Sequence, residues 1–213
     1  MIDRGQPAPS DPAASDDDLA RRAAAGDPDA LADLLERFRP RVWSVCRRMV
    51  GPELADDLAH DSLVRAIQGI PSFKGESAFS TWIIRVAMNT CLSYRRRQAR
   101  RDRLAPTDRS RSIDDAEPAE LPWNPRGPHG VQPDIEGAES LERVDRALRR
   151  IDETHRAVLV LRDVQGLEYA QIAEVLGVKR GTVKSRLFRA REALRSALHQ
   201  GGPPAPQPPK DAD

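Results

Sequence analysis

The sequence has few of the features that mark disulfide-rich, metal-binding or membrane proteins. Only two cysteines, Cys46 and Cys91, occur in 213 residues, and they have neither metal-ligand spacing nor a C-x-x-C pairing. Both fall within apolar helical patterns, so we interpret them as small buried side chains in a reducing compartment. No apolar run approaches membrane-spanning length, and the N-terminal residues lack the apolar core of a signal peptide. We therefore expect a soluble, cytoplasmic protein with no membrane insertion.

Motifs of the common enzyme classes are also missing. The sequence contains no G-x-S-x-G, P-loop or H-E-x-x-H motif and no Ser/His/Asp order. His60-Asp61 is similar to the metal-binding pair of HD-type phosphohydrolases, which need further His and Asp ligands on neighbouring helices. The other histidines, His129, His155 and His199, do not complete a ligand set. We expect no enzyme, no catalytic residue, no metal and no cofactor, and the phosphohydrolase remains an alternative.

Proline divides the chain into two blocks. Most of the 18 prolines lie near the N-terminus, between Pro106 and Pro133, and near the C-terminus. We interpret 1–14 as a disordered arm, 104–138 as a flexible linker and 200–213 as a disordered tail, because their composition cannot support a packed core. Two helical domains remain, 15–103 and 139–199. With no strand pattern of useful length, the predicted fold class is all-α.

The first block shows four helical patterns. Ser15 followed by three aspartates predicts a helix start, and Asp27-Pro28 predicts another. Apolar residues then recur at three- and four-residue intervals, and Pro40 should kink or break that helix. A third helix follows Gly51-Pro52. After a loop from Gly69 to Glu76, a fourth helix runs from about Ser77 into an arginine run.

The second block contains a helix-turn-helix pattern. Asp152 caps an apolar helix from about Glu153 to Val164. Further on, Gly177 separates two amphipathic helices. The inner-face residues that we predict for these two helices are Ile172, Ala173, Leu176, Val183, Leu187, Ala190 and Leu194. A small side chain, a glycine turn and a branched apolar residue are what two closely crossing helices require.

The net charge of +1 conceals two basic clusters. Seven basic residues and one acid occur from Lys179 to Arg195, and a second run extends from Arg95 to Arg103. Such clusters are typical of surfaces that dock a polyanion, the alternative being a solvated face. The outer face of the second helix carries Lys184, Ser185, Phe188 and Arg189, which suit phosphate and base-edge contacts in a major groove. Phe188 lies off the apolar stripe and could meet a thymine methyl group; alternatively it packs on the preceding domain helix.

Three motifs in one order resemble extracytoplasmic-function (ECF) sigma factors of the sigma-70 family, the specificity subunits of bacterial RNA polymerase. A-D-D-L-A-H-D-S-L-V-R-A is similar to the polymerase-clamp helix of that family. F-K-G-E-S-A-F-S-T-W-I-I-R-V-A-M-N-T-C is similar to the segment that reads and opens the minus-ten element. G-T-V-K-S-R-L-F-R-A-R is similar to the reader of the minus-thirty-five element. The resemblance implies a four-helix region 2 domain and a helix-turn-helix region 4 domain.

The resemblance also implies residue roles. Polymerase-facing residues would be Asp56, Asp57, His60 and Asp61, although His60 departs from the glutamine frequent in the family. Minus-ten contacts would be made by Phe73, Lys74, Asn89, Ser93, Arg96 and Arg97, with a flipped non-template base captured. Minus-thirty-five contacts would be made by Arg180, Thr182, Lys184, Ser185, Phe188 and Arg189. Trp82 belongs to the same motif, but its apolar neighbours favour a core role.

The implied partners are core RNA polymerase, double-stranded promoter DNA, the melted non-template strand and an anti-sigma factor. The resemblance thus predicts a factor that directs promoter recognition and transcription initiation. An alternative is a helix-turn-helix regulator that acts without being a polymerase subunit. This alternative accounts for the helix-turn-helix in 139–199 equally well, but it assigns no function to the helices of 53–91.

Overall fold

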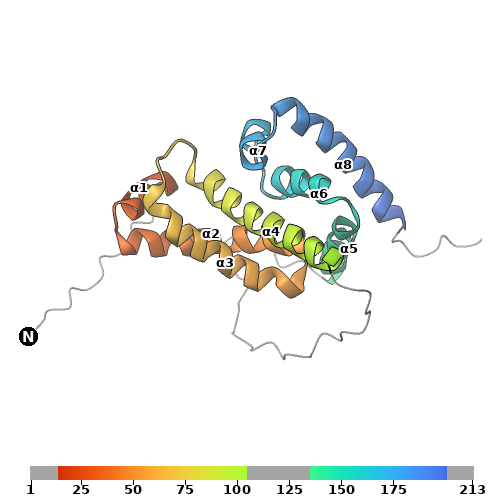
Figure 1. The fold of residues 1–213 in the computed structure, drawn as a ribbon, viewed down its shortest axis with the longest axis horizontal. Coiled ribbons are helices and arrows are strands. Elements are labelled where there is room, and N and C mark those ends of the chain that lie inside the picture. The colour runs from red at the N-terminus through yellow and green to blue at the C-terminus, as the bar shows by residue number, and fades with distance from the viewer. Residues whose placement is uncertain (1–13, 105–134, 201–213) are drawn as a thin grey trace, which may run out of the picture.

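The computed structural model describes residues 14–104 and 135–200, and every regular element in those ranges is helical. The all-α fold class is therefore confirmed. The helices form a first body, α1 to α4, and a second body, α5 to α8 (Figure 1). The elements in chain order are α1 (Asp16–Ala24), α2 (Pro28–Val50), the 3₁₀ helix η1 (Pro52–Leu54), α3 (Ala55–Gly69), the 3₁₀ helix η2 (Ile70–Ser72), α4 (Phe79–Leu104), α5 (Ile135–Arg150), α6 (Glu153–Leu159), the π-helical turn η3 (Val160–Val164), α7 (Tyr169–Leu176) and α8 (Arg180–Gln200).

Local capping fixes where the first helices begin. The Ser15 side chain accepts a hydrogen bond from the Asp18 amide at 3.1 Å. Asp27 Oδ1 accepts from the amides of Asp29 and Ala30 at 3.0 and 3.1 Å, and Pro28 takes the first helical position. Each cap satisfies amide groups that lack a partner within the helix. Both predicted helix starts are confirmed.

Pro40 does not break α2, which continues from Pro28 to Val50. Proline inside a helix costs about 3 kcal/mol through a lost hydrogen bond and a steric clash. The apolar stripe on either side is fully covered, with Phe38 2% exposed and Val42, Val45 and Met49 0% exposed. Burying one such side chain contributes about 1.5–3 kcal/mol. The packing of this stripe therefore outweighs the cost of the proline.

A cluster of aromatic rings and a cap from α1 position the start of α4. The Phe79 ring lies edge-on to Phe38 and Phe73, with centroids 5.1 and 5.7 Å apart. Asp17 Oδ1, on α1, accepts a hydrogen bond from the Phe79 amide at 2.8 Å. The helix therefore begins at Phe79, two residues after the predicted Ser77.

The segment predicted as a linker is shorter in the structure than in the sequence analysis. Helix α4 extends to Leu104, and α5 already begins at Ile135, although 104–138 was assigned to the linker. Gly137 lies within α5; a single helical glycine costs only about 1 kcal/mol, which the following turns of the helix offset. The rest of the linker, 105–134, lies outside the described residues. So do 1–13 of the predicted arm and 201–213 of the predicted tail.

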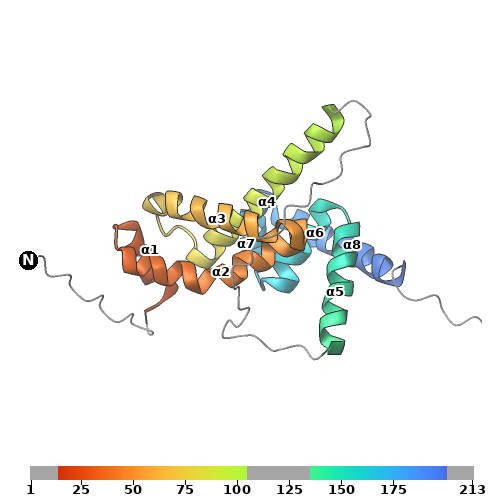
Figure 2. The same cartoon turned by 90° about the horizontal axis from the view of Figure 1, so that it is seen from below.

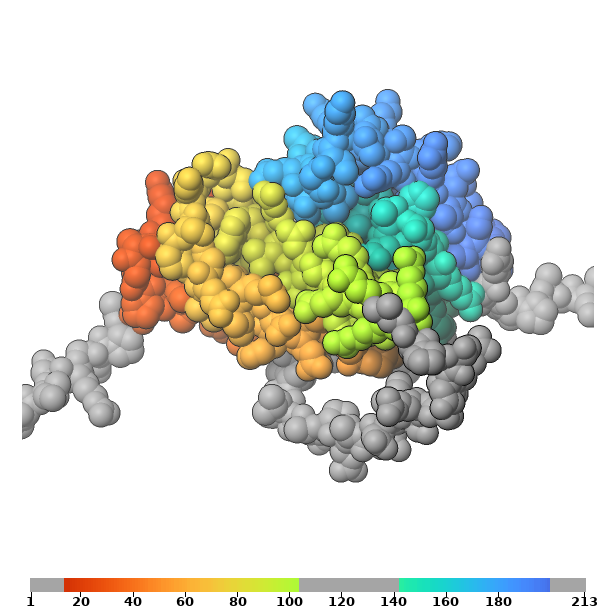
Figure 3. Space-filling view, in the orientation of Figure 1, coloured from red at the N-terminus to blue at the C-terminus, as the bar shows by residue number. Residues whose placement is uncertain are grey.

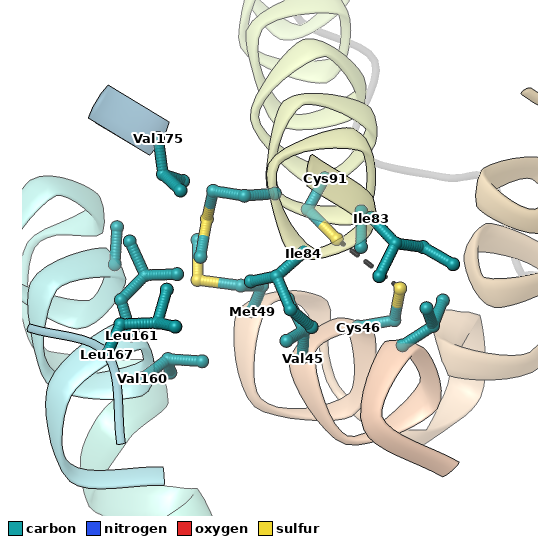
Figure 4. Packing of buried hydrophobic residues seen from close by; sticks show 14 of the residues in the cluster. Val45, Cys46, Met49, Ile83, Ile84, Cys91, Val160, Leu161, Leu167 and Val175 are labelled. Atoms are coloured by element: carbon teal, nitrogen blue, oxygen red, sulfur yellow. Dashed lines mark hydrogen bonds between the residues drawn. The ribbon is translucent and has the colours of Figure 1, made fainter. Parts of the chain in front are cut away.

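The two bodies pack directly against each other (Figure 3). One hydrophobic cluster runs through both, and Figure 4 shows Met49 and Ile84 of the first body facing Val160 and Leu161 of the second. Polar contacts between the two bodies flank this hydrophobic cluster. Arg47 pairs with Asp145 at 3.0 Å, Arg95 with Glu153 at 3.3 Å and Arg85 with Glu174 at 3.7 Å, while Gln171 Nε2 donates to Thr81 Oγ1 at 3.0 Å. The sequence patterns predicted the helices of each body but not this contact.

Arg156 lies in the contact between the two bodies and is only 1% exposed. Its guanidinium donates to the carbonyls of Leu148, Arg149 and Ile151 at the C-terminal end of α5, at 2.7, 2.8 and 3.1 Å. It also donates to the Met49 carbonyl, at the end of α2, at 2.6 Å. Burial lowers the pKa of Arg156 to about 10, so the side chain stays charged at neutral pH. The Arg156 side chain thus binds carbonyl groups at the C-terminal ends of two helices, α2 of the first body and α5 of the second.

Cys46 and Cys91 lie side by side in the first body, with their Sγ atoms 3.7 Å apart (Figure 4). Both are free thiols and 0% exposed. The hydrogen bond with Cys46, together with burial, raises the pKa of the Cys91 thiol far above its usual range. The interpretation of both as small buried side chains is confirmed.

Candidate nucleic-acid interface

The turn between α7 and α8 has the geometry of a helix-turn-helix. Gly177 adopts the left-handed conformation at φ 64° and ψ 36°, which favours glycine because a Cβ atom would be strained there. The Val178 amide then donates to the Ala173 carbonyl at 3.0 Å and closes the turn. At the start of α7, the Glu168 amide donates to Gln171 Oε1 at 2.8 Å. The first two features shape the turn before α8, and the third caps the start of α7.

The inner face of α8 holds the helix against the second body. Val183 and Ala190 are 0% exposed and Leu187 is 2% exposed, as the spacing predicted. Leu194, Ala173 and Leu176 are half-buried, whereas Ile172 is buried. The structure adds Val175 and Ala197 to the buried set. Burial of this stripe leaves the opposite face of α8 free for a ligand.

That outer face is exposed and basic. Lys184, Ser185 and Arg189 are exposed, and the Phe188 ring is 70% exposed. The packing of Phe188 on another helix, the alternative interpretation, is therefore wrong. Arg180 is exposed and Thr182 half-buried at the start of the helix, where the Thr182 carbonyl accepts from Ser185 Oγ at 3.1 Å. An aromatic ring among cations, open to solvent, suits contact with a polyanion that also offers apolar groups.

A second candidate surface is an open pocket of about 430 Å³ between α3 and α4. Asn89 and Ser93, both predicted for minus-ten contact, lie in its wall on α4 together with Trp82. The α3 side of the wall contains Arg65, Gln68 and Gly69, which the sequence analysis did not single out. Asp61, Arg65 and Gln68 recur at four- and three-residue spacing, a signal that could have placed the last two on one polar helix face.

Phe73 and Lys74 do not line this pocket. Phe73 is half-buried, and its ring lies 5.5 Å from that of Trp82, so it supports the pocket wall from behind. Lys74 is exposed in the loop that follows η2. Trp82 is half-buried: it packs on Phe73 and Phe79, as the predicted core role requires, and one side of it also lines the pocket.

Gly69 allows the Trp82 ring to lie close to α3. A Cβ atom added at Gly69 would stand 3.2 Å from the ring carbon Cζ2, tighter than ordinary van der Waals contact. A larger residue at this position would push the Trp82 ring away from α3 within the pocket wall.

The C-terminal half of α4 extends away from the rest of the molecule (Figure 2). Arg96 and Arg97 on this extension are exposed and bind Ser93, through Oγ at 3.2 Å and the carbonyl at 3.3 Å respectively. Arg95 differs from them because it pairs with Glu153 of the second body. The exposed arginines continue from the pocket along α4.

The predicted polymerase-facing residues lie on the first two turns of α3. Asp56, Asp57, His60 and Asp61 are all exposed. Asp56 Oδ1 also accepts a hydrogen bond from Trp43 Nε1 at 2.8 Å, a contact that the sequence analysis did not foresee. These side chains form an acidic surface at the opposite end of α3 from the pocket.

Neither a metal-binding cluster nor a membrane-spanning helix occurs in the part of the chain that the structure describes. No group of three or more His, Cys, Asp or Glu side chains within 14–104 and 135–200 could hold a metal ion. None of the helices described there combines the length and the apolar character needed to cross a bilayer.

Comparison with known proteins agrees with this geometry. The Sigma-70 region 2 model matches residues 34–101, and the Sigma-70 region 4 model matches residues 141–194. The ECF RNA polymerase sigma-E factor of Haemophilus influenzae is 32% identical over 86% of this chain and 95% of its own length. The RNA polymerase sigma-H factor of Pseudomonas aeruginosa is 33% identical over 86% of this chain and 93% of its own.

A solved structure shows the same fold. The sigma factor RpoE of Bartonella quintana, in complex with the anti-sigma factor NepR, superposes with a TM-score of 0.58 at 23% identity, over 80% of this chain and 98% of that one. Both family models match one body each, and the full-length relatives span both. The chain therefore belongs to the ECF group of the sigma-70 family of RNA polymerase sigma factors.

Proposed function

We propose that this chain binds core RNA polymerase through the acidic end of α3 and directs it to promoters by two DNA-reading surfaces. The outer face of α8 reads the minus-thirty-five element in the major groove. The pocket and the arginines of α4 engage the minus-ten element and the melted non-template strand. The observation that carries the proposal is the solvent-exposed Phe188 ring among cations on the second helix of a helix-turn-helix.

The chemistry of each surface supports this division. Lys184 and Arg189 supply donors for phosphate or guanine edges, and the Phe188 ring can cover a thymine methyl group. Asn89 offers an amide to the edge of an unpaired base beside the Trp82 ring. Asp57 and Asp61 present charges to a basic partner surface. The protein then acts by binding alone, without catalysis, in the cytoplasm where polymerase and chromosome meet.

We also propose an anti-sigma factor as a partner. The RpoE of Bartonella quintana was solved with one, and its fold matches this chain. Such a partner would regulate when the chain reaches core polymerase.

Run-off transcription with core polymerase and a pool of genomic promoters tests the function. Added protein should direct new start sites, and Arg189→Ala should weaken them, because a base-edge contact contributes about 1–3 kcal/mol. The matched control is Arg150→Ala, which removes an exposed arginine of α5 outside the α8 face. No new start site with the unmodified chain would refute the function. Tight promoter binding without polymerase would favour the helix-turn-helix regulator instead.

A further inference from the structure

Two polar side chains of α3 lie in the pocket wall without a partner. Arg65 and Gln68 are exposed, and neither makes a hydrogen bond or ion pair with any other residue in the described ranges. Asn89, on the opposite wall, also has no such partner there. By contrast, Thr90 already donates to the Val86 carbonyl at 2.9 Å. The donors of Arg65 and the amides of Gln68 and Asn89 are thus available to a ligand.

The chemistry of the pocket wall favours a nucleotide of a nucleic-acid strand. Arg65 is the sole charged side chain among the residues that line the pocket, and no acid accompanies it. A guanidinium binds phosphate oxygens. Gln and Asn amides pair with base edges, and Trp82 adds an aromatic side chain to the same wall. The volume of about 430 Å³ lies in the range of small-ligand pockets.

Helix α3 carries this pocket wall and the acidic surface on one face. Asp57, Asp61, Arg65 and Gln68 follow each other at spacings of four, four and three residues. Side chains at these spacings stack along one side of a helix. The face is acidic over its first turns and basic and amide-bearing over its last. At 1.5 Å per residue, Asp61 and Gln68 stand only about 10 Å apart along the axis.

We propose that α3 is itself a DNA-reading helix. Arg65 contacts a phosphate and Gln68 a base edge of the strand that α4 holds, while Asp57 and Asp61 on the same face contact polymerase. Helix α3 then forms a rigid bridge between the enzyme and the minus-ten element. This inference rests on the proposed function and assigns to α3 a part of the sequence preference.

Holoenzyme built from core polymerase and the full chain tests the inference on a promoter panel with each base at each minus-ten position. Gln68→Ala should reduce the preference for one base at one position by about tenfold. Arg65→Ala should weaken promoter binding on all sequences and lower the slope of log affinity against log salt by about one unit. Arg65→Lys should restore that slope because it retains the charge.

The matched control is Arg39→Ala, which removes an exposed arginine of α2 that lies outside the pocket lining and has no ion pair within 14–104 and 135–200. If both α3 variants behave like this control while the unmodified holoenzyme opens promoters, the inference is wrong and the proposed function stands. If both variants instead lose affinity for core polymerase alone, α3 is only a polymerase contact and the inference is again wrong. If the unmodified chain opens no promoter, the proposed function itself fails.

Discussion

Phe188 is the residue whose placement argues most directly for contact with another molecule. An exposed phenylalanine is unfavourable in water, and this one lies among cations on α8 with 70% of its surface exposed. Its removal should therefore affect a complex far more than the fold.

We expect Phe188→Ala to weaken holoenzyme binding to the minus-thirty-five element by about 1 kcal/mol, or roughly fivefold, because part of the ring would be buried in the complex. The free energy of unfolding should change by less than about 0.5 kcal/mol. Filter binding and chemical denaturation measure the two effects. If Phe188→Ala weakens binding equally to a duplex whose minus-thirty-five element is scrambled, the result contradicts a sequence-reading role.

Arg156 is a buried residue with the opposite role. It donates to four backbone carbonyls. Arg95 also donates to the Met49 carbonyl, at 3.4 Å, so removal of Arg156 takes the guanidinium donor from the other three, those of Leu148, Arg149 and Ile151. We expect Arg156→Met to lower the free energy of unfolding by at least about 3 kcal/mol, since each buried carbonyl left without a donor costs about 1–3 kcal/mol and removal of the buried charge offsets part of that cost. Urea denaturation measures it, with Arg150→Met, an exposed change on α5, as the control. A loss equal to that of the control would show that the carbonyls find other partners.

At the scale of single helices, local sequence decided most boundaries. The caps at Ser15, Asp27 and Asp152 were predictable because a side chain and an amide two or three residues later need no other part of the chain. The inner face of α8 was predictable because helical spacing alone brings Val183 and Leu187 together. Of the kink or break predicted at Pro40, the structure excludes the break. The sequence could not decide between them, because the tolerance of a helical proline depends on neighbours that pack from other helices.

The Asp152 cap leads to a prediction for α6. Its side chain accepts from the Thr154 amide at 2.8 Å, and hydrogen bonds with Thr154 lower the pKa of Asp152. Asp152→Ala should cost about 1 kcal/mol of stability at neutral pH. Because the pKa is lowered in the folded state, this stability is present above the unfolded-state pKa of about 4 and is lost as the pH falls through the folded value.

The difference in unfolding free energy between Asp152→Ala and the unmodified chain should therefore shrink below about pH 4. Denaturation at several pH values measures it. Asp152→Asn keeps an uncharged acceptor and serves as the control. A difference that stays constant down to pH 2 would contradict an ionised cap.

For the whole molecule, the decisive feature is the contact between the two bodies. Asp145 of α5 is 6% exposed and lies between Arg47, at 3.0 Å, and Arg48, at 3.9 Å, of α2. Desolvated charges of this kind tolerate removal of a partner poorly. The outer face of α8, with Lys184 and Phe188, and the arginines Arg96 and Arg97 of α4 nevertheless remain exposed to solvent in this arrangement.

We expect Asp145→Arg to separate the bodies, since it sets three cations together in a poorly solvated place. The radius of gyration from small-angle scattering should rise while the helical content from circular dichroism stays nearly constant. The double change Arg47→Asp with Asp145→Arg should recover part of the compact form. An unchanged radius for the single variant would mean that the apolar contact alone holds the bodies.

Some parts of the candidate site could be predicted from residues close together in the sequence, and others needed the tertiary structure. The α8 face followed from spacing and charge within one helix. The α4 side of the pocket followed from motif resemblance, but Arg65 and Gln68 become part of that pocket only because α3 packs alongside α4. Phe73, by contrast, was predicted to belong to the site but lies outside the pocket, because its ring packs on those of Phe79 and Trp82.

The sequence by itself determined the two sets of helices, their caps, the helix-turn-helix and the family resemblance, because these depend on residues within a few turns of each other. Tertiary structure alone decided the joint core of the two bodies, the buried Arg156 between two helix ends and the two-walled pocket. Each of these needs groups far apart in the chain, such as Met49 and Arg156, to meet, and no local periodicity encodes which distant surfaces will exclude water together.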